Sequence, residues 1–261
     1  MKKIFKITGI VLGVVLILLI IAGIIGYSRM SSKAKDTYAR LGDRAPELTI
    51  NDFNYRDLNK NGKLDVYEDS RLSIEARVED LVSQMTLEEK AGSMFITMIG
   101  MTPDGDPLDK PFLTSNPIDI MMTFMMDSNA EMLVDKKMNS FNILQSNSAR
   151  VLARYNNQIQ LISERSRLGI PVTIASDPRH GAENNPGAAL STPTFSQWPT
   201  SLGLAATRDT ILVREFGDIA RQEYLATGIR LALHPMADLA TEPRWGRSNG
   251  TFGEDAELSA M

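Results

Sequence analysis

The stretch "RLGIPVTIASDPRHG", residues 167–181, decides the fold of this chain. Its centre, residues 170–176, is a short apolar run rich in β-branched side chains, which is typical of a buried strand. The run passes directly into Asp177, and His180 follows shortly afterwards. A strand that ends in polar residues predicts a functional loop at the carboxyl edge of a sheet.

The segments around this strand alternate with it. Residues 148–169 and residues 209–228 both carry apolar side chains at helical spacing. Residues 229–239 form a second strand-like run that leaves into a polar loop, and this run contains His234. Strand, helix and strand in this order predict parallel pairing with helices outside the sheet, which is the α/β class. Both histidines of the chain then fall on the face that builds active sites in α/β barrels.

The N-terminus is a long apolar segment. No charged side chain occurs between Lys6 and Arg29. The uncharged run Ile7–Tyr27 spans about 31 Å as a helix, roughly the thickness of a bilayer core. A cleavable signal peptide usually has a shorter apolar region and a small-residue cleavage site. Residues 1–28 are therefore expected to be a membrane anchor, with a removed signal peptide as the alternative, and residues 29–56 a polar stalk or linker.

Composition excludes several classes of protein. The net charge of −4 leaves no basic footprint for nucleic acid. The chain has no cysteine, so disulfides and thiolate metal sites are ruled out. With the anchor retained, the globular part is expected outside the cytoplasm at the cell membrane, and it would be secreted if the anchor were cleaved. The methionine-rich segment 118–138 has no functional interpretation from its sequence.

A calcium-type loop is predicted before the globular region. The segment "DLNKNGKLDVYE", residues 57–68, matches the EF-hand-like pattern D-x-[DN]-x-[DN]-G-x5-E at every specified position. Oxygen ligands for a structural Ca²⁺ would come from six residues: Asp57, Asn59, Asn61, Lys63 through its carbonyl, Asp65 and Glu68. The preceding segment contains Pro46 and lacks a helical stripe, so this is at best half of a helix-loop-helix motif. A surface turn built on Asn and Gly is the alternative.

Two further stretches could bind a polar ligand. Asp177 at the end of its strand could accept hydrogen bonds from two neighbouring sugar hydroxyls, and an Asp-Pro turn is the alternative. In "EPRWGRSNGTFGED", residues 242–255, Arg244 and Arg247 flank Trp245. Arginine offers paired donors and tryptophan an apolar face for a sugar ring, whereas a loop pinned by tryptophan packing is the alternative. A lone histidine such as His180 is more often packed than catalytic.

Taken in order, four segments of the chain resemble the N-terminal barrel domain of family 3 glycoside hydrolases, the β-glucosidase and β-xylosidase-like enzymes. They are "RVEDLVSQMTLEEKAGSMF", "RLGIPVTIASDPRHG", "GLAATRDTILVREFGDIARQEYLATGIRLALHPMADLATEPRWGR" and "TFGED". The resemblance implies a (β/α)8 TIM-type barrel followed by an α/β sandwich domain, and a retaining mechanism on β-linked sugars at the non-reducing end. Residues 70–261 are then expected to be an incomplete barrel, the N-terminal part of that domain.

The resemblance also assigns roles to residues. Asp177 and Arg247 stand where the family binds the terminal sugar, and His180 matches a histidine that shapes the site. The chain reads "SNG" at residues 248–250, where many members have an acidic residue, so the sugar contacts differ in detail. The family's nucleophile and acid/base would both fall beyond Met261. No catalytic residue is therefore expected in this chain, and no cofactor for catalysis.

The sequence thus predicts the N-terminal fragment of an exported retaining β-glycosidase that grips a β-linked oligosaccharide or glycoside without cleaving it. One alternative is a non-catalytic, membrane-anchored module that binds calcium or carbohydrate. The other is one half of a two-chain enzyme, in which a downstream polypeptide completes the barrel.

Overall fold

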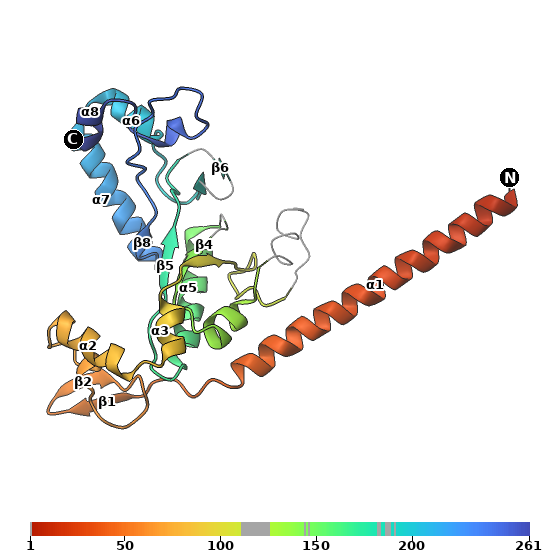
Figure 1. Cartoon of the computed structure of the whole chain (residues 1–261), viewed down its shortest axis with the longest axis horizontal. Coiled ribbons are helices and arrows are strands. Elements are labelled where there is room, and N and C mark those ends of the chain that lie inside the picture. Colours follow the sequence, from red (N-terminus) through yellow and green to blue (C-terminus); the bar gives the residue numbers. More distant parts are fainter. Residues whose placement is uncertain are drawn as a thin grey trace.

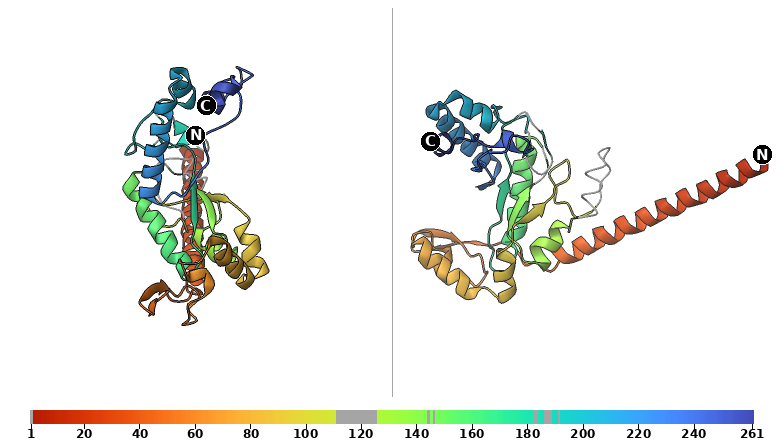
Figure 2. Two further views of the ribbon diagram at one scale, coloured as in Figure 1. Left: turned by 90° about the vertical axis from the view of Figure 1, so that its left-hand side faces the viewer. Right: turned by 45° about the horizontal axis from the view of Figure 1, so that its top comes forward.

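The computed structural model of the chain describes residues 2–110, 126–143, 145, 147–181, 184–185, 189–190 and 192–261. A long N-terminal helix projects from a body of mixed helices and strands, and Figures 1 and 2 show this projection from several sides. Met121, Met122 and Met125 of the methionine-rich segment lie outside the described residues.

The projecting helix is α1 (Lys2–Tyr38). Its part from Thr8 to Tyr38 is long and apolar enough to cross a membrane. The last turns of α1 pack on the body, because Ala34 and Thr37 are buried. Tyr38 Oη also donates a hydrogen bond to Asp109 Oδ2 at 2.9 Å. Helix α1 therefore runs without a break into the body.

The predicted polar stalk at residues 29–56 differs from the structure. Its first part is the end of α1, and its last part is an antiparallel hairpin of β1 (Glu47–Ile50) and β2 (Phe53–Arg56). The polar side chains of this stretch have partners far along the chain: Lys33 Nζ lies 2.6 Å from Glu131 Oε2, and Arg56 pairs with Glu164. The interpretation as a linker was wrong, since the stretch forms ion pairs with the body. The sequence did not indicate these ion pairs because the partner residues are remote along the chain.

The centre of the body is a parallel sheet. Four strands lie in the order β3-β4-β5-β8, which is also their order along the chain. Their bounds are β3 (Thr97–Ile99), β4 (Ser140–Ile143), β5 (Thr173–Ser176) and β8 (Leu231–Ala232). Helix α5 (Ala149–Glu164) connects β4 to β5, and α6 (Ser201–Thr207) and α7 (Thr210–Thr227) precede β8. The α/β class is confirmed, and within the described residues the sheet is open, with β3 and β8 at its edges.

The predicted second strand is much shorter than residues 229–239. Only Leu231 and Ala232 pair with β5, opposite Ala175 and Ser176. β8 is an edge strand of the described sheet with exposed side chains, and Pro235 has no N–H to extend the ladder. The chain beyond Ala232 is therefore a loop, which carries His234 away from the sheet.

The hydrophobic core lies between α5 and the sheet. Leu152, Tyr155 and Ile159 form the inward stripe of α5 and have no exposed surface. They pack with Phe141 of β4 and Ile174 of β5, which are equally buried. This stripe is the one that the helical spacing of residues 148–169 predicts. The core packs against β4 and β5, and so positions Asn142 of β4 and Asp177 directly after β5.

The remaining elements surround this centre. Their bounds are η1 (Val66–Glu68), α2 (Ile74–Gln84), α3 (Leu87–Ser93), η2 (Glu131–Asp135), β6 (Asn184–Asn185), β7 (Ala189–Leu190), η3 (Ser248–Gly250) and α8 (Ala256–Ala260). Thr86 and Glu89 form a capping box at the start of α3. Helix α7 ends at Gly228 with φ 86°, and a Cβ at this position would lie 2.8 Å from Asn156 Cβ on α5. Glycine therefore lets α7 end close against α5.

Candidate functional site

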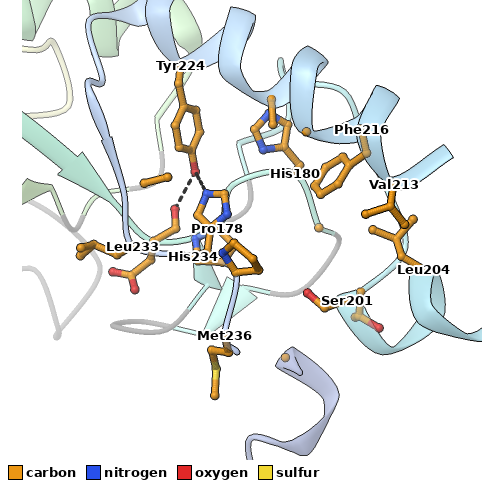
Figure 3. Close-up of a pocket in the computed structure, with 18 of the residues that line it drawn as sticks. Pro178, His180, Ser201, Leu204, Val213, Phe216, Tyr224, Leu233, His234 and Met236 are labelled. Atoms are coloured by element: carbon orange, nitrogen blue, oxygen red, sulfur yellow. Dashed lines mark hydrogen bonds between the residues drawn. The ribbon is translucent and has the colours of Figure 1, made fainter. Parts of the chain in front are cut away.

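A cavity of about 490 Å³ lies beyond the carboxyl ends of β5 and β8, with α6 and α7 forming its wall. Figure 3 shows the residues that line it. One part of the lining is polar and comes from the loops after the strands: Asp177, His180, His234, Arg247 and Asn249. The other part is apolar and comes largely from α6, α7 and β8, including Leu204, Val213, Phe216 and Leu231. The cavity can therefore hold a ligand that has both polar groups and apolar surface.

Asp177 is the first residue after β5 and is half-buried at the cavity. Its Oδ2 accepts a hydrogen bond from Asn142 Nδ2 of the neighbouring strand β4 at 2.8 Å. Its backbone oxygen accepts two hydrogen bonds, from Tyr224 Oη at 2.9 Å and from Ser176 Oγ at 2.8 Å. The carboxylate is thus held by the adjacent strand, and within the described residues its Oδ1 has no hydrogen-bond partner.

Arg179 fixes the loop that carries Asp177. It has no exposed surface, and its guanidinium donates to Ser176 Oγ at 2.6 Å, Gln145 O at 3.0 Å, and Thr192 Oγ1 and Ile143 O at 3.2 Å each. These acceptors tie the ends of β4 and β5 together. Burial lowers the pKa of Arg179 to about 10, so the side chain remains charged at neutral pH.

His180 is a packed histidine at the edge of the cavity. Only 2% of it is exposed, and its ring lies 5.2 Å from the ring of Phe195 and 5.3 Å from that of Tyr224. Its Nε2 is 2.8 Å from Glu223 Oε2. Burial lowers the pKa of His180, and the nearby carboxylate of Glu223 opposes this shift. Its contact with the cavity is therefore small.

His234 also lines the cavity, and it belongs to the loop that follows β8. Its Nε2 lies 3.0 Å from Tyr224 Oη, and the two rings meet edge to face. Burial lowers the pKa of His234 to about 4. The imidazole is therefore neutral at physiological pH.

Arg247 is an exposed cation of the cavity lining, which also contains the exposed Arg221 and Arg230. In the described part of the chain, its guanidinium has only Met236 Sδ as a partner, at 3.4 Å. Arg244, by contrast, forms an ion pair with Glu242 at 2.8 Å and lies outside the lining, as does Trp245. The predicted sugar platform of Arg244 and Trp245 is therefore not part of this cavity. Of the three side chains singled out in this loop, Arg247 alone lines it.

Sequence reasoning missed several residues that hold the site, namely Asn142, Arg179, Glu223 and Tyr224. For Glu223 a signal did exist, because it falls on the inward stripe of α7 with Phe216 and Ala220. A carboxylate on an inward stripe indicates a buried partner, and His180 is that partner. For Arg179 and Asn142 there was no such signal, since their partners come from other strands.

The loop at residues 57–68 lies at the opposite end of the body, between β2 and η1 (Figure 1). Asp57 is 2% exposed and Glu68 is 8% exposed. Asp57 accepts hydrogen bonds from two backbone N–H groups at 3.0 and 2.8 Å, and Glu68 from three at 2.6 to 3.3 Å. Within the described residues neither carboxylate forms an ion pair with Lys or Arg. Burial raises the pKa of Glu68.

The other predicted ligands of this loop bond to one another. Asn59 and Asn61 both donate from Nδ2 to Asp65 Oδ2, at 2.8 and 2.7 Å, and the Lys63 N–H donates to Asn61 Oδ1 at 2.8 Å. Across the described ranges, no three His, Cys, Asp or Glu side chains gather closely enough to hold a metal ion. A strand precedes the loop, in keeping with Pro46, so the segment is not a full helix-loop-helix.

Comparisons with known proteins identify a matching family domain and several relatives. The glycosyl hydrolase family 3 N-terminal domain matches residues 86–261. The periplasmic beta-glucosidase/beta-xylosidase of Dickeya chrysanthemi is 46% identical over 82% of this chain and 31% of its own length. Beta-glucosidase C of Emericella nidulans is 42% identical over 79% of this chain and 31% of its own length. A glycosyl hydrolase structure of the same family from Mycobacterium smegmatis aligns with a TM-score of 0.45 and 14% identity, covering 69% of this chain and 45% of that one. The chain thus spans about a third of the length of these curated relatives.

Proposed function

The chain belongs to glycosyl hydrolase family 3, and on this premise we propose that it is the sugar-binding part of an exported, retaining β-glycosidase. The substrate class would be β-linked glycans or glycosides, cleaved at the non-reducing end. The observation that carries the proposal is that Asp177 and Arg247, from loops distant in sequence, line one cavity beyond the carboxyl ends of parallel strands. Relatives named beta-glucosidase and beta-xylosidase support this substrate class.

The two side chains suit a sugar because they offer opposite hydrogen-bonding groups. The Asp177 carboxylate accepts from sugar hydroxyls, and the Arg247 guanidinium donates to hydroxyl oxygens in a planar, paired geometry. Asn142 holds one oxygen of Asp177, which leaves the second oxygen oriented before the ligand arrives. Such pre-orientation lowers the entropic cost of binding. The apolar wall of α6 and α7 would cover the less polar faces of a glycoside.

We place neither the nucleophile nor the acid/base among these residues. A retaining glycosidase needs two carboxyl groups about 5–5.5 Å apart across the scissile bond. In the described part of the chain, Asp177 is the only carboxylate that lines the cavity. The catalytic pair would then come from a further segment of the enzyme or from a second polypeptide that completes an incomplete (β/α)8 barrel. The sequential order of the four parallel strands supports the barrel.

Replacing Arg247 by methionine tests the sugar-binding proposal. We expect the affinity of the full 261-residue chain for methyl β-D-glucoside to fall about tenfold or more, because charge-assisted hydrogen bonds are lost. Arg244→Met is the matched control: it removes an arginine of the same loop that pairs with Glu242 outside the cavity, and it should leave affinity unchanged. Titration calorimetry measures both. Equal losses in the two variants would contradict a specific role for Arg247.

A second candidate function is a non-catalytic module that binds sugar or calcium. Among the described residues that line the cavity there is a single carboxylate, which favours this candidate. The glycosidase proposal and the module proposal differ in whether sugar is hydrolysed once the remainder of the enzyme is present. Sugar binding that never leads to hydrolysis, in any longer polypeptide containing this chain, would favour the module.

We also place the globular part outside the cytoplasm, anchored by α1. Support comes from the apolar Thr8–Tyr38 segment and from the word periplasmic in the name of the Dickeya relative. Extraction of membranes with alkaline carbonate distinguishes a retained anchor from a removed signal peptide. A chain with the anchor stays in the membrane, whereas a cleaved chain is released.

The loop at residues 57–68 is proposed to bind a structural Ca²⁺. Its chemistry fits, because every predicted ligand atom is an oxygen, and Ca²⁺ prefers oxygen. Asp57 and Glu68 are buried without a Lys or Arg partner in the described structure, and buried charges are usually paired or metal-bound. A bound cation would stabilise both carboxylates in their charged form. The ion has no part in the chemistry of the sugar cavity at the other end of the body.

Saturating Ca²⁺ is expected to raise the thermal unfolding midpoint of the chain. At a concentration about 100 times the dissociation constant, the added stability is about 2.7 kcal/mol. Glu68→Gln should abolish this gain, since the amide loses the charge and the bidentate geometry that Ca²⁺ requires. Glu75→Gln, on the first turn of the adjacent α2, should leave it intact. Scanning calorimetry with and without chelator measures the effect, and an equal midpoint in both solutions would contradict the site.

A further inference from the structure

Hydrogen bonds connect His234 to Asp177 through Tyr224, and all three residues line the cavity. Tyr224, on α7, lies between them: its Oη is 3.0 Å from His234 Nε2 and 2.9 Å from the backbone oxygen of Asp177. Figure 3 shows His234 among the residues that line the cavity, with both hydrogen bonds of Tyr224 Oη drawn. The loops after β5 and β8 are therefore coupled through one helix side chain.

The donor-to-acceptor direction of these two hydrogen bonds fixes the tautomer of His234. A backbone carbonyl can only accept, so the single hydroxyl proton of Tyr224 goes to Asp177 O. The Tyr224 oxygen must then accept a proton from the other side, and His234 Nε2 supplies it. Burial keeps the imidazole neutral by lowering its pKa to about 4. Nδ1 of His234 therefore carries no proton and is a hydrogen-bond acceptor.

This acceptor has no partner in the described part of the chain. Its residue lines the cavity and is partly exposed, and Nδ1 forms no hydrogen bond with the described residues. His180 gives the contrast: its Nδ1 also has no partner within the described structure, but that atom is fully buried. Of the two histidines, His234 is the one whose free nitrogen a ligand can reach.

We propose that His234 is a specificity-determining residue, whose Nδ1 accepts a hydrogen bond from one hydroxyl of the terminal sugar. This inference rests on the proposed function. Asp177 and Arg247 hold other hydroxyls of the same ring, and the Tyr224 hydrogen bonds fix the spacing between His234 and Asp177. A site built to bond a hydroxyl discriminates against the analogue that lacks it, because the acceptor is then left unpaired.

Two variants separate the two ring nitrogens. His234→Gln places an amide N–H near the Nε2 position, so the hydrogen bond to Tyr224 can persist while the Nδ1 acceptor is lost. His234→Asn places its amide near the Nδ1 position and loses the contact with Tyr224. The probes are methyl β-D-glucoside and its four monodeoxy analogues, titrated calorimetrically into the full chain.

The inference predicts one specific pattern of affinities. The wild-type chain should bind several deoxy analogues more weakly than the parent, and His234→Gln should lose the difference, about tenfold or more, for one of them only, while binding the parent about tenfold weaker. His234→Asn should retain part of the difference, because its amide oxygen can replace the acceptor. Unchanged discrimination in His234→Gln, or an equal loss for all five sugars, overturns the inference alone. No binding of any of these sugars by the folded wild-type chain overturns the proposed function, and the inference with it.

A second measurement reads the tautomer without a ligand. Nitrogen-15 NMR of labelled histidine in the full chain, assigned with His234→Gln, should show a neutral ring with the proton on Nε2 at pH 7. A proton on Nδ1, or a protonated ring, overturns the inference whatever the affinities are.

Discussion

Replacing Arg179 by methionine is expected to lower the free energy of unfolding by about 2–4 kcal/mol and to weaken sugar binding at the same time. The guanidinium is fully buried and donates hydrogen bonds to the carbonyls of Ile143 and Gln145, at and just beyond the end of β4. Methionine fills similar volume but donates no hydrogen bond, and each buried carbonyl left unsatisfied costs about 1–3 kcal/mol. Part of this loss is offset, because a buried cation is no longer desolvated.

Sugar binding should fall in the same variant because Arg179 holds the loop between Asp177 and His180. Arg179→Lys should be intermediate, since an ammonium keeps the charge but not the planar fork that reaches four acceptors. Arg154→Met is the control: its ion pair with Asp106 is exposed, and its loss should cost less than about 0.5 kcal/mol. Urea unfolding followed by circular dichroism measures all three. Wild-type stability and wild-type affinity in Arg179→Met would show that this buried cation does not hold the site.

Replacing Asp177 by alanine is expected to weaken binding of methyl β-D-glucoside about 100-fold. The carboxylate is the only charged acceptor that the described structure places on the cavity lining, and charge-assisted hydrogen bonds contribute about 1.5–3 kcal/mol each. A tenfold change in affinity corresponds to about 1.4 kcal/mol, so two such bonds account for the factor. Titration calorimetry of the full chain gives the number directly.

Asp177→Asn is the matched variant for this prediction. It keeps the shape and one oxygen, but its amide would face the Nδ2 donor of Asn142 unless it turned, so we expect an intermediate loss. Because Asp177 is half-buried and outside the hydrophobic core, both variants should unfold within about 1 kcal/mol of the wild type. Wild-type affinity in Asp177→Ala would remove this residue from the sugar site.

Local patterns in the sequence were enough to predict the framework of the fold. The stripe of Leu152, Tyr155 and Ile159 predicted α5, and the β-branched run before Asp177 predicted β5. Helix caps such as Thr86 with Glu89 were also predictable, because they depend on residues within one turn of each other. Each of these features depends on neighbours along the chain.

Features that depend on remote partners were not predictable in the same way. The polar stretch after Arg29 looked like a linker because its partner Glu131 is about a hundred residues away. The run at residues 229–239 has the composition of a long strand, but β8 ends at Ala232 at the edge of the described sheet. Nothing in the sequence motif indicated a structural role for Arg179, although its four hydrogen bonds fix the loop that carries Asp177.

In the candidate site, too, some residues could be predicted from the sequence, and others depend on partners that are remote along the chain. Asp177, His180 and Arg247 came from the resemblance to a family, and the structure places them on one cavity. Tyr224 and Glu223 could be found only once α7 was packed against the loop, because each acts through a residue of that loop. What the resemblance could not supply was the chain of hydrogen bonds from His234 through Tyr224, which sets the geometry of the polar part of the cavity.

The most direct test of the whole account is proton NMR of the purified 261-residue chain with 4-nitrophenyl β-D-glucopyranoside. The account predicts saturation transfer from protein to the sugar ring protons, loss of this transfer in Asp177→Ala, and no release of nitrophenol by either protein. Transfer that persists in Asp177→Ala would contradict the binding site. Steady hydrolysis by the wild-type chain would contradict the claim that these residues grip the sugar without supplying the two catalytic carboxylates.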